Sequence, residues 1–252
     1  MILDQFRIDG QVAVVTGGTK GLGKAIVLAL AEAGADIVAV SRNPNLELET
    51  AVNQMGRDYS HIRADLTQRN QTRKVIAEAV SALGDVNILV NNAGIIKRAA
   101  ARDYSESDWD KTLEIDLTAA FVLSQAAGQV MLQKGKGKII NVASIMAFQG
   151  GLNVAAYAAA KHGIAGLTKA LANDWASKGI NVNALAPSFF ETELTQAIQK
   201  DPERAASITK RTPFGRWGRP DEIAGAALFL ASPASDFIHG VILPVDGGWM
   251  AW

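Results

Sequence analysis

A tyrosine and a lysine four residues apart form the pattern with the clearest chemical meaning in this sequence. Tyr157 and Lys161 stand in the segment YAAAK, and Ser144 lies upstream at the end of an apolar run. Residues four apart share one face of a helix, so the phenol and the ammonium would lie together. A nearby cation favours the phenolate and brings a phenol, whose ordinary pKa is about 10, towards working range. The pair is a candidate acid and base, although chance would give the same spacing.

The elements that must position this pair follow from an alternation of short β-branched apolar runs with longer alanine-rich segments of helical period. Apolar strands separated by helices are typical of a parallel sheet covered on both faces. We expect a single α/β domain over residues 1–252, with a doubly wound parallel sheet of seven strands. The expected strands are 11–16, 36–40, 59–63, 87–90, 138–142, 180–185 and 241–245, and the clearest helices are 21–34, 110–133 and 154–177.

One segment, residues 189–219, interrupts this alternation. It is rich in charged residues and too long for an ordinary connection, and it follows the carboxyl end of the sixth expected strand. Ligands of open α/β sheets bind at the carboxyl ends of the strands, and long loops in compact domains are usually functional. We therefore expect a substrate lid here, with a solvated surface insertion as the alternative.

A glycine-rich turn joins the first expected strand to the first helix. Its sequence, TGGTKGLG over residues 16–23, lets the backbone approach a pyrophosphate, whose charge the helix N-terminus stabilises. The spacing is Gly-x-x-x-Gly-x-Gly, which is not a Walker loop, so ATP is disfavoured. A dinucleotide is the expected ligand.

The end of the second strand indicates which dinucleotide. Enzymes for NAD commonly carry an acid there that bonds the ribose 2′-hydroxyl, whereas this chain has Ser41 followed by Arg42. A guanidinium suits a 2′-phosphate, and Lys20 in the glycine turn adds a second cation. NADP(H) is favoured and NAD(H) is the alternative, since either cation alone could be a solvated surface charge.

Composition excludes several other classes of protein. The 252 residues carry 25 basic and 25 acidic side chains and no cysteine. Balanced charge argues against a nucleic-acid partner or a polybasic membrane contact, and the lack of cysteine excludes a thiolate nucleophile. The first residues carry charges where a signal peptide is apolar, and no apolar run is long enough to span a bilayer. We expect a cytoplasmic protein without a metal site.

The glycine turn, the segment NNAG at 91–94, Ser144 and the Tyr157–Lys161 pair occur in the order typical of the short-chain dehydrogenase/reductase family, which the whole chain resembles. The resemblance implies a single Rossmann-type domain that moves a hydride between a nicotinamide and an alcohol or ketone. It assigns Asp65 to the adenine and Pro187 to the nicotinamide. Ser188 stands where the family usually has glycine. The residues expected at the cofactor are Gly17, Thr19, Lys20, Gly21, Leu22, Gly23, Ser41, Arg42, Asp65, Leu66, Asn92, Ala93, Gly94, Tyr157, Lys161, Pro187, Phe190 and Thr192.

The resemblance also assigns catalytic roles. Tyr157 would donate a proton to the developing alkoxide, Ser144 would orient the substrate oxygen, and Lys161 would lower the tyrosine pKa and hold the nicotinamide ribose. Asp116 stands where the family usually has an asparagine that places a water behind the lysine. It is expected either to take part in that relay or to bond nearby backbone as a structural variant.

Segments around 92–98, 144–151 and 215–218 resemble the 2-deoxy-D-gluconate 3-dehydrogenase and gluconate 5-dehydrogenase branch, which implies a sugar-acid or keto-sugar substrate. Arginine or lysine would clamp its carboxylate, and amides would contact its hydroxyls. The expected substrate residues are Ser144, Met146, Arg98, Gln149, Asn153 and Trp217, with Lys97 and Arg216 as further carboxylate candidates.

Three further expectations remain open. A 3-ketoacyl thioester reductase is the alternative enzyme, and a dinucleotide-binding regulator without turnover is a weaker alternative. Trp249 and Trp252 end the chain in an apolar tail. The resemblance implies a homotetramer, with this tail either at a subunit interface or packed on its own core.

Overall fold

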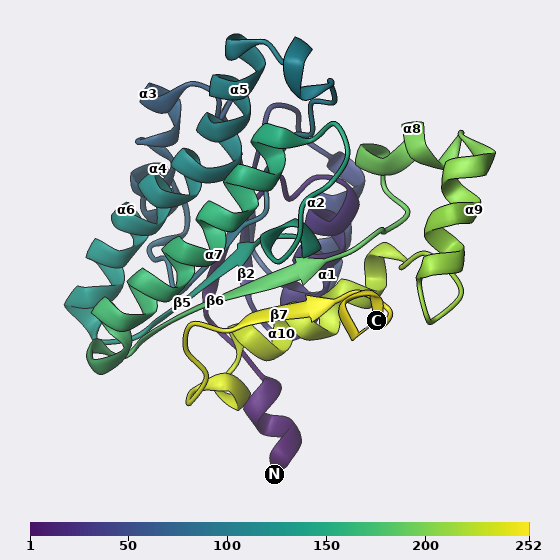
Figure 1. Ribbon diagram of the computed structural model, residues 1–252. Helices are drawn as coiled ribbons and strands as arrows, with labels where there is room; N and C mark the ends of the chain where they lie inside the picture. The colour runs from purple at the N-terminus through teal and green to yellow at the C-terminus, as the bar shows by residue number, and fades with distance from the viewer. Residues whose placement is uncertain (252) are drawn as a thin grey trace.

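The computed structural model describes residues 1–251 as a seven-stranded sheet between two layers of helices (Figure 1). All neighbouring strands pair in parallel, in the order β3-β2-β1-β4-β5-β6-β7. The strands are β1 Val12–Thr16, β2 Asp36–Ser41, β3 Tyr59–Arg63, β4 Ile88–Asn91, β5 Gly137–Val142, β6 Ile180–Pro187 and β7 Ile242–Val245. The expected fold and its strands are therefore confirmed. The order reverses between β1 and β4, the point where such sheets bind ligands.

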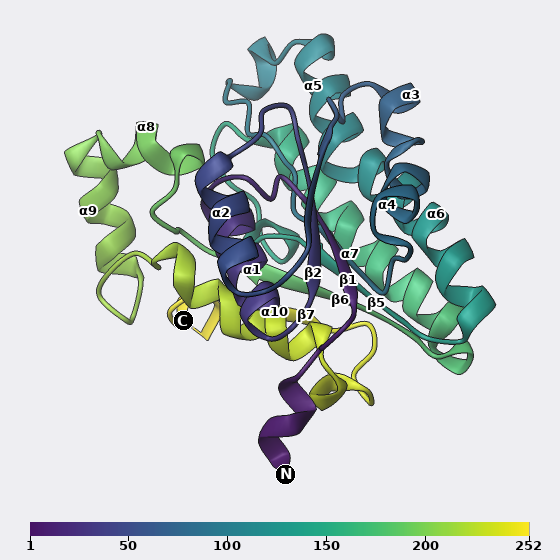
Figure 2. The ribbon, with the colours of Figure 1, turned by 180° about the vertical axis from the view of Figure 1, so that it is seen from behind.

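Helices cover both faces of the sheet, as Figures 1 and 2 show from opposite sides. They are α1 Gly21–Glu32, α2 Leu46–Gln54, α3 Arg69–Thr72, α4 Val75–Leu83, α5 Glu106–Leu113, α6 Ala119–Lys134, α7 Ala155–Trp175, α8 Gln196–Gln199, α9 Pro202–Arg211 and α10 Ala224–Ala231. One layer contains α1, α2 and α10, and the other contains α4, α6 and α7. Because both faces of the sheet are covered, β1 and β4 lie entirely in the core and their sequences show no alternation of apolar and polar residues.

The helix expected at 110–133 contains an irregularity that its sequence pattern did not indicate. It begins at Glu106, and a π-helical turn, Glu114–Thr118, separates α5 from α6. The run 106–134 is long and apolar enough to cross a bilayer by length and composition. It instead packs along the sheet, where Leu123, Ala127 and Met131 are buried. The π turn carries Asp116 into the interior.

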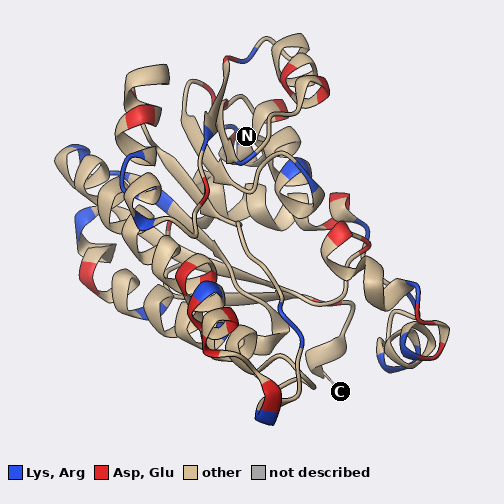
Figure 3. Ribbon diagram, turned by 90° about the horizontal axis from the view of Figure 1, so that it is seen from above, with Lys and Arg blue, Asp and Glu red and all other residues tan. Residues whose placement is uncertain are grey.

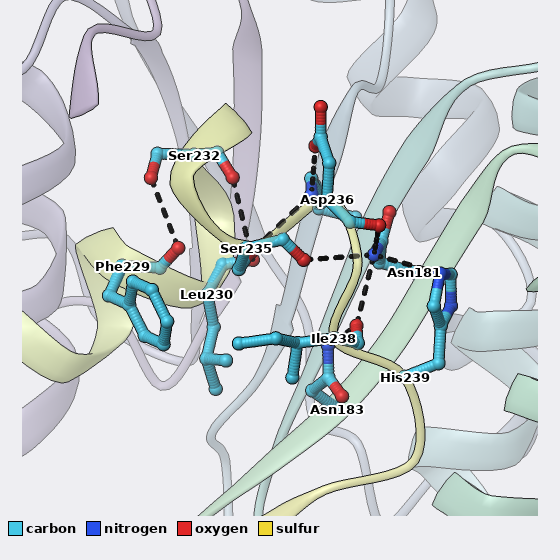
Figure 4. Close-up of polar contacts among 10 residues, drawn as sticks. Asn181, Asn183, Phe229, Leu230, Ser232, Ser235, Asp236, Ile238 and His239 are labelled. Atoms are coloured by element: carbon cyan, nitrogen blue, oxygen red, sulfur yellow. Dashed lines mark hydrogen bonds and ion pairs between the residues drawn. The ribbon is translucent and has the colours of Figure 1, made fainter. Parts of the chain in front are cut away.

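The end of the sheet opposite the ligand site is fastened by side-chain amides (Figure 4). The Asn181 amide donates to the carbonyls of Ser235, Asp236 and Ile238 at 3.0–3.2 Å. Asn183 donates to Ile238 at 2.8 Å and accepts from the backbone of the next turn. These bonds satisfy the buried backbone of the connection that leads into β7. The side-chain amides of Asn181 and Asn183 at this end of the sheet therefore have a structural role.

Basic and acidic residues are interspersed along the helices in the ribbon of Figure 3. This agrees with the equal numbers of basic and acidic side chains in the sequence. The segment 189–219 carries its own charged residues and leaves the sheet as α8 and α9, which project beyond the end of β6 (Figure 1).

Candidate active site

The glycine turn lies between β1 and α1, with its backbone facing a cavity of about 1030 Å³ at the carboxyl ends of the strands. Gly17 and Gly21 have φ angles of +63° and +53°, which favour glycine. A methyl group at Gly23 would overlap the carbonyl of Gly17, so the turn can close only around glycine at this position. The turn therefore brings free helix N-terminal amides to the cavity.

The turn is held against the end of β4 by Thr16 and Asn92. The Thr16 hydroxyl accepts hydrogen bonds from the backbone of Asn92 and Ala93, at 2.9 and 3.0 Å. The Asn92 amide donates to the Thr16 carbonyl at 2.9 Å. Asn91, the first residue of the expected NNAG segment, is buried instead and donates to Asn141 at 2.8 Å. It braces β4 against β5 and does not line the cavity.

The far end of the cavity is lined by Ser41, Arg42, Asp65 and Leu66. Burial alone would raise the pKa of Asp65, but hydrogen bonds from Thr67 and the nearby Arg42 charge lower it. Arg42 is exposed and has no ion-pair partner among residues 1–251. No carboxylate ends β2. This end of the cavity thus offers a free guanidinium where a 2′-phosphate would lie.

Lys20 was expected to add a second cation to that pocket, but it has a partner. Its ammonium lies 2.5 Å from a carboxylate oxygen of Glu193, in the segment that follows β6. Both side chains are largely exposed, so this ion pair contributes little stability. It does join the glycine turn to the expected lid across the mouth of the cavity.

Ser144, Tyr157 and Lys161 meet at the end of β5. Ser144 follows the strand and caps a short 3₁₀ helix, accepting from the Met146 backbone at 3.1 Å. Tyr157 lies in the first turn of α7, and the neighbouring Ser144 hydroxyl acts to lower its pKa. The Lys161 ammonium lies 5.4 Å from the centre of the Tyr157 ring and donates to the Val142 carbonyl at 3.0 Å. One face of α7 therefore presents an acid–base pair to the cavity.

Asp116 lies directly behind Lys161 and is almost fully buried. One carboxylate oxygen accepts from the Ile95 backbone at 2.8 Å, and the other lies 3.3 Å from the Lys161 ammonium. The π turn places this side chain because its extra residue rotates the helix locally, and such turns are frequent at functional sites. The backbone bond expected of a structural variant is therefore present, and the same carboxylate contacts the lysine, whereas the relay role stays a prediction.

Burial is the largest influence on the pKa values of both Tyr157 and Asp116. Burial raises the pKa of Tyr157, the Lys161 charge opposes that effect, and the Asp116 charge adds to it. Burial likewise raises the pKa of Asp116, against the Lys161 charge and the Ile95 N–H. The expected action of Lys161 on the tyrosine is present in direction, but Asp116 offsets part of it. The state of Asp116 therefore controls how much positive charge Tyr157 experiences.

Three of the expected substrate residues line the cavity beside Ser144: Met146, Gln149 and Arg98. Two others do not, and the structure corrects these predictions. Trp217 is buried under Phe189, with ring centres 5.4 Å apart, so it supports the wall from behind. Asn153 adopts a left-handed conformation, φ +61°, in the exposed turn before α7, where its carbonyl accepts from the backbone of residue 99.

Two other carboxylate candidates have partners of their own. Arg216 donates to both carboxylate oxygens of Glu222, at 2.7 and 2.6 Å, and does not line the cavity. Lys97 lines the cavity but lies 3.6 Å from the carboxylate of Asp108. Arg98 alone among the predicted cations lies at the substrate end without a carboxylate partner among the described residues.

The segment 189–219 forms one side of the cavity. Its base is closed by a parallel bridge between Phe190 and Gly218, and α8 and α9 form the excursion between them. Phe189, Phe190 and Thr192 line the cavity, as do Pro187 and Ser188 before them. Ser188 has no left-handed φ, so the turn does not require the glycine usual there.

Sequence reasoning missed two arginines of α9. Arg204 and Arg211 line the same cavity as Tyr157, and Ser207 and Ile208 lie between them on the same helical face. The signal was available in the sequence as arginines seven residues apart, with serine and isoleucine at helical spacing between them.

The residues at the cofactor end fit a dinucleotide phosphate. Open backbone amides at the glycine turn suit a pyrophosphate, and Arg42, which has no ion-pair partner in the described part of the chain, suits a 2′-phosphate. The cavity runs from Arg42 past Gly94 to Tyr157, so one elongated ligand can contact all of them. The fit concerns these side chains and the shape of the cavity, and it agrees with the preference indicated by the sequence.

Comparisons with known proteins give a consistent result. Residues 17–250 match the family model described as enoyl-(acyl carrier protein) reductase. The chain is 47% identical to the 2-dehydro-3-deoxy-D-gluconate 5-dehydrogenase of Bacillus subtilis, with 98% of each chain covered. It is 39% identical to a 3-oxoacyl-[acyl-carrier-protein] reductase of Vibrio cholerae, with 96% of this chain and 98% of the other covered.

A similar solved structure is the gluconate 5-dehydrogenase of Burkholderia cenocepacia in complex with NADP and tartrate. It is 41% identical to this chain, covers all of both chains and has a TM-score of 0.95.

Proposed function

This chain belongs to the short-chain dehydrogenase/reductase family, and from that premise we propose that it moves a hydride between NADP(H) and a secondary alcohol or ketone of a sugar acid. The observation that carries the substrate class is Arg98, which faces the Tyr157 cavity without a carboxylate partner among residues 1–251. A guanidinium in that position suits a substrate carboxylate. The gluconate dehydrogenases similar to this chain act on such acids by their names.

The reacting end of the cavity supplies a proton and a positioned oxygen. When bound, the nicotinamide ring supplies or accepts the hydride. In reduction, the Tyr157 hydroxyl donates its proton to the carbonyl oxygen while the carbon gains the hydride, and the tyrosine is reprotonated from solvent. The Ser144 hydroxyl donates a hydrogen bond to the same oxygen and stabilises its developing charge. Oxidation reverses each step, with the Tyr157 phenolate as the base.

Lys161 and Asp116 act behind the tyrosine. The Lys161 ammonium, held by the Val142 carbonyl, stabilises the phenolate and is placed to bond a ribose hydroxyl. Asp116 holds the ammonium from the other side and sets the net charge of the pair. We propose that Asp116 is a positioning residue in place of the asparagine usual in the family.

NADP(H) is the proposed cofactor, with NAD(H) as the weaker alternative. Support comes from Arg42 at the end of β2 and from similar structures described with bound NADP. Lys20 is not needed for this preference, because its charge is paired with Glu193.

A substrate panel tests the proposed function. The enzyme is supplied with NADP⁺ or NADPH and with sugar acids, their keto forms and a 3-ketoacyl thioester, and cofactor absorbance is followed. We expect kcat/KM for a sugar acid to exceed that for the thioester at least about tenfold, as one charge-assisted hydrogen bond allows. The reverse order would favour the reductase alternative, which the similarity to the Vibrio cholerae enzyme supports. Binding of NADPH without turnover would favour a regulator.

We propose that the enzyme is a homotetramer of the reducing cytoplasm. Phe121 and Leu132 on α6 are partly exposed, and Phe237 is fully exposed, so apolar surface is free for subunit contacts. Trp249, in contrast, is buried against Phe189 within its own chain. Trp252 lies outside the described residues. Light scattering after size exclusion checks the oligomer, and cell fractionation checks the compartment.

A further inference from the structure

The helix α9 turns one charged face towards the active-site cavity. Arg204, Ser207, Ile208 and Arg211 are the residues of α9 that line the cavity, and their spacing places them on one face. Asp201 caps the helix, with its carboxylate accepting from the Arg204 backbone at 3.1 Å, and Pro202 is its first residue. Ile208 is buried and seats the helix on the body of the protein. The two arginines are thus held at the cavity by a regular, anchored helix.

These two arginines differ in how they are restrained. The Arg211 guanidinium lies 4.0 Å from the centre of the Trp249 ring and donates to Gln149 at 3.3 Å. Its geometry is therefore fixed before any ligand binds. The side chain of Arg204 has no hydrogen-bond or ion-pair partner among residues 1–251. It is the guanidinium of α9 that remains available to a ligand.

Arg98 lies close enough across the cavity for the two charges to interact. Burial lowers the pKa of Arg98 first, and the charge of Arg204 lowers it further. Two other cations around the lid have carboxylate partners, Lys20 with Glu193 and Arg216 with Glu222. Two like charges facing one cavity without an acid between them destabilise each other, and an anion between them would relieve this.

We propose that Arg204 is a specificity-determining residue that holds the carboxylate of a sugar acid together with Arg98. The inference rests on the proposed function, because it names the substrate group that the lid recognises. Arg98 belongs to the connection after β4 and Arg204 to α9, so a carboxylate between them ties the lid to the body of the protein. An anionic substrate thereby holds the lid against the body of the protein, and a neutral polyol does not.

Substitution of Arg204 by glutamine tests this, with D-gluconate binding measured by calorimetry on the NADPH complex, which cannot oxidise the sugar acid. We expect Arg204→Gln to weaken D-gluconate binding about tenfold to a hundredfold, the range for charge-assisted hydrogen bonds. The dissociation constant of NADPH should not change, which shows that the protein is folded. Lys210→Gln is the matched control, since Lys210 is an exposed cation of α9 that does not line the cavity. It should change neither constant.

Steady-state kinetics give a second measurement. Arg204→Gln should raise KM for the sugar acid much more than it lowers kcat, and Arg204→Lys should recover part of the loss because it keeps the charge without the planar fork. For D-glucitol, which carries CH₂OH in place of the carboxylate, the same substitution should leave kcat/KM unchanged.

The inference is overturned if Arg204→Gln binds D-gluconate as tightly as the wild type, or if it weakens D-glucitol by the same factor. It is also overturned if the wild type binds no sugar acid. A wild type that binds D-gluconate through Arg204 but turns over no sugar acid would contradict the proposed function and leave this inference standing.

Discussion

Replacement of Asp116 by asparagine changes one charge behind the catalytic pair and keeps its shape. The carboxylate lies 3.3 Å from the Lys161 ammonium and accepts a backbone hydrogen bond from Ile95. An asparagine can present a carbonyl oxygen to either donor. The substitution therefore removes the negative charge with little change in packing. We expect Tyr157 to ionise more readily in the variant, because the group that opposes Lys161 is gone.

The size of the effect follows from the two distances. Lys161 lies 5.4 Å from the centre of the Tyr157 ring, so at an effective dielectric constant of about 20 it stabilises a phenolate by about 3 kcal/mol. The distance from the Asp116 carboxylate to the centre of the Tyr157 ring cannot exceed the sum of the 5.4 Å from the ring to Lys161 and the 3.3 Å from Lys161 to Asp116. Its repulsion of the phenolate is then about 2 kcal/mol, which corresponds to roughly a 25-fold change in the phenolate population.

The assay is the pH dependence of kcat/KM for alcohol oxidation, which needs the phenolate. We expect the inflection to move to lower pH in Asp116→Asn, with a rate roughly 25-fold higher below it when proton removal limits turnover. Reduction needs the phenol, so its fall with rising pH should also begin earlier. At pH values where Asp116 is protonated in the wild type, position 116 is neutral in both proteins and the two profiles should converge.

The pH dependence of protein stability gives a second, independent test of the environment of Asp116. Burial raises the pKa of Asp116 above its ordinary 3.8, so the folded wild type binds more protons than the unfolded chain between these values. The stability from this residue is complete below its ordinary pKa and is lost as pH rises through the folded value. Asp116→Asn should lack this loss in urea titrations over the same pH window.

A matched control is available at the other end of β5. Lys138 is buried and lies 2.6 Å from Asp236, so Asp236→Asn also removes the carboxylate partner of a buried lysine. It should leave the pH–rate profile unchanged. A profile of Asp116→Asn that coincides with the wild type, or that shifts to higher pH, would refute the electrostatic role of Asp116.

Three further predictions concern the choice of cofactor, the stability of the glycine turn and the catalytic tyrosine. Arg42→Ala should lower kcat/KM for NADPH about tenfold to a hundredfold and leave NADH nearly unaffected, and equal losses would contradict the assignment of NADP(H). Gly23→Ala should destabilise the protein by about 1–3 kcal/mol in urea unfolding through overlap with the glycine turn, whereas Gly225→Ala on α10, with open space around it, should stabilise by up to about 1 kcal/mol. Tyr157→Phe should lower kcat by about 10²- to 10⁴-fold with NADPH affinity retained, and a smaller loss would point to another proton donor.

The fold was predictable from the sequence because its signals are local. Most strands are short apolar runs, with β3 (Tyr59–Arg63) as the polar exception at the edge of the sheet, and burial of both faces of β1 and β4 explains why their runs are continuous. The π turn at Glu114–Thr118 was not predictable, since an extra residue in a helical turn leaves the surrounding apolar pattern almost unchanged.

The site was predictable where its residues lie close together in sequence. Tyr157 and Lys161 share one turn of helix, so their contact followed from spacing alone. Trp217 and Asn153 lie outside the lining of the cavity because the direction of a loop side chain depends on tertiary packing, here the tilted contact of Trp217 with Phe189 and the left-handed turn at Asn153. The proposed role of Arg204 depends on Arg98, which lies far away in sequence in the connection after β4. No local sequence pattern links the two residues.

The charges around Tyr157 divide between two groups that act in different ways. Asp116 offsets Lys161 from within the protein, so the lysine alone does not provide the full positive field at the phenol. Arg98 also lowers the pKa of Tyr157, and its guanidinium is free at the substrate end, within the part of the chain that the structure describes. If a carboxylate binds Arg98, that part of the field is offset as well, and the phenol becomes harder to ionise. Substrate binding therefore favours the protonated tyrosine, which is the form that reduction requires, and Asp116 strengthens that preference.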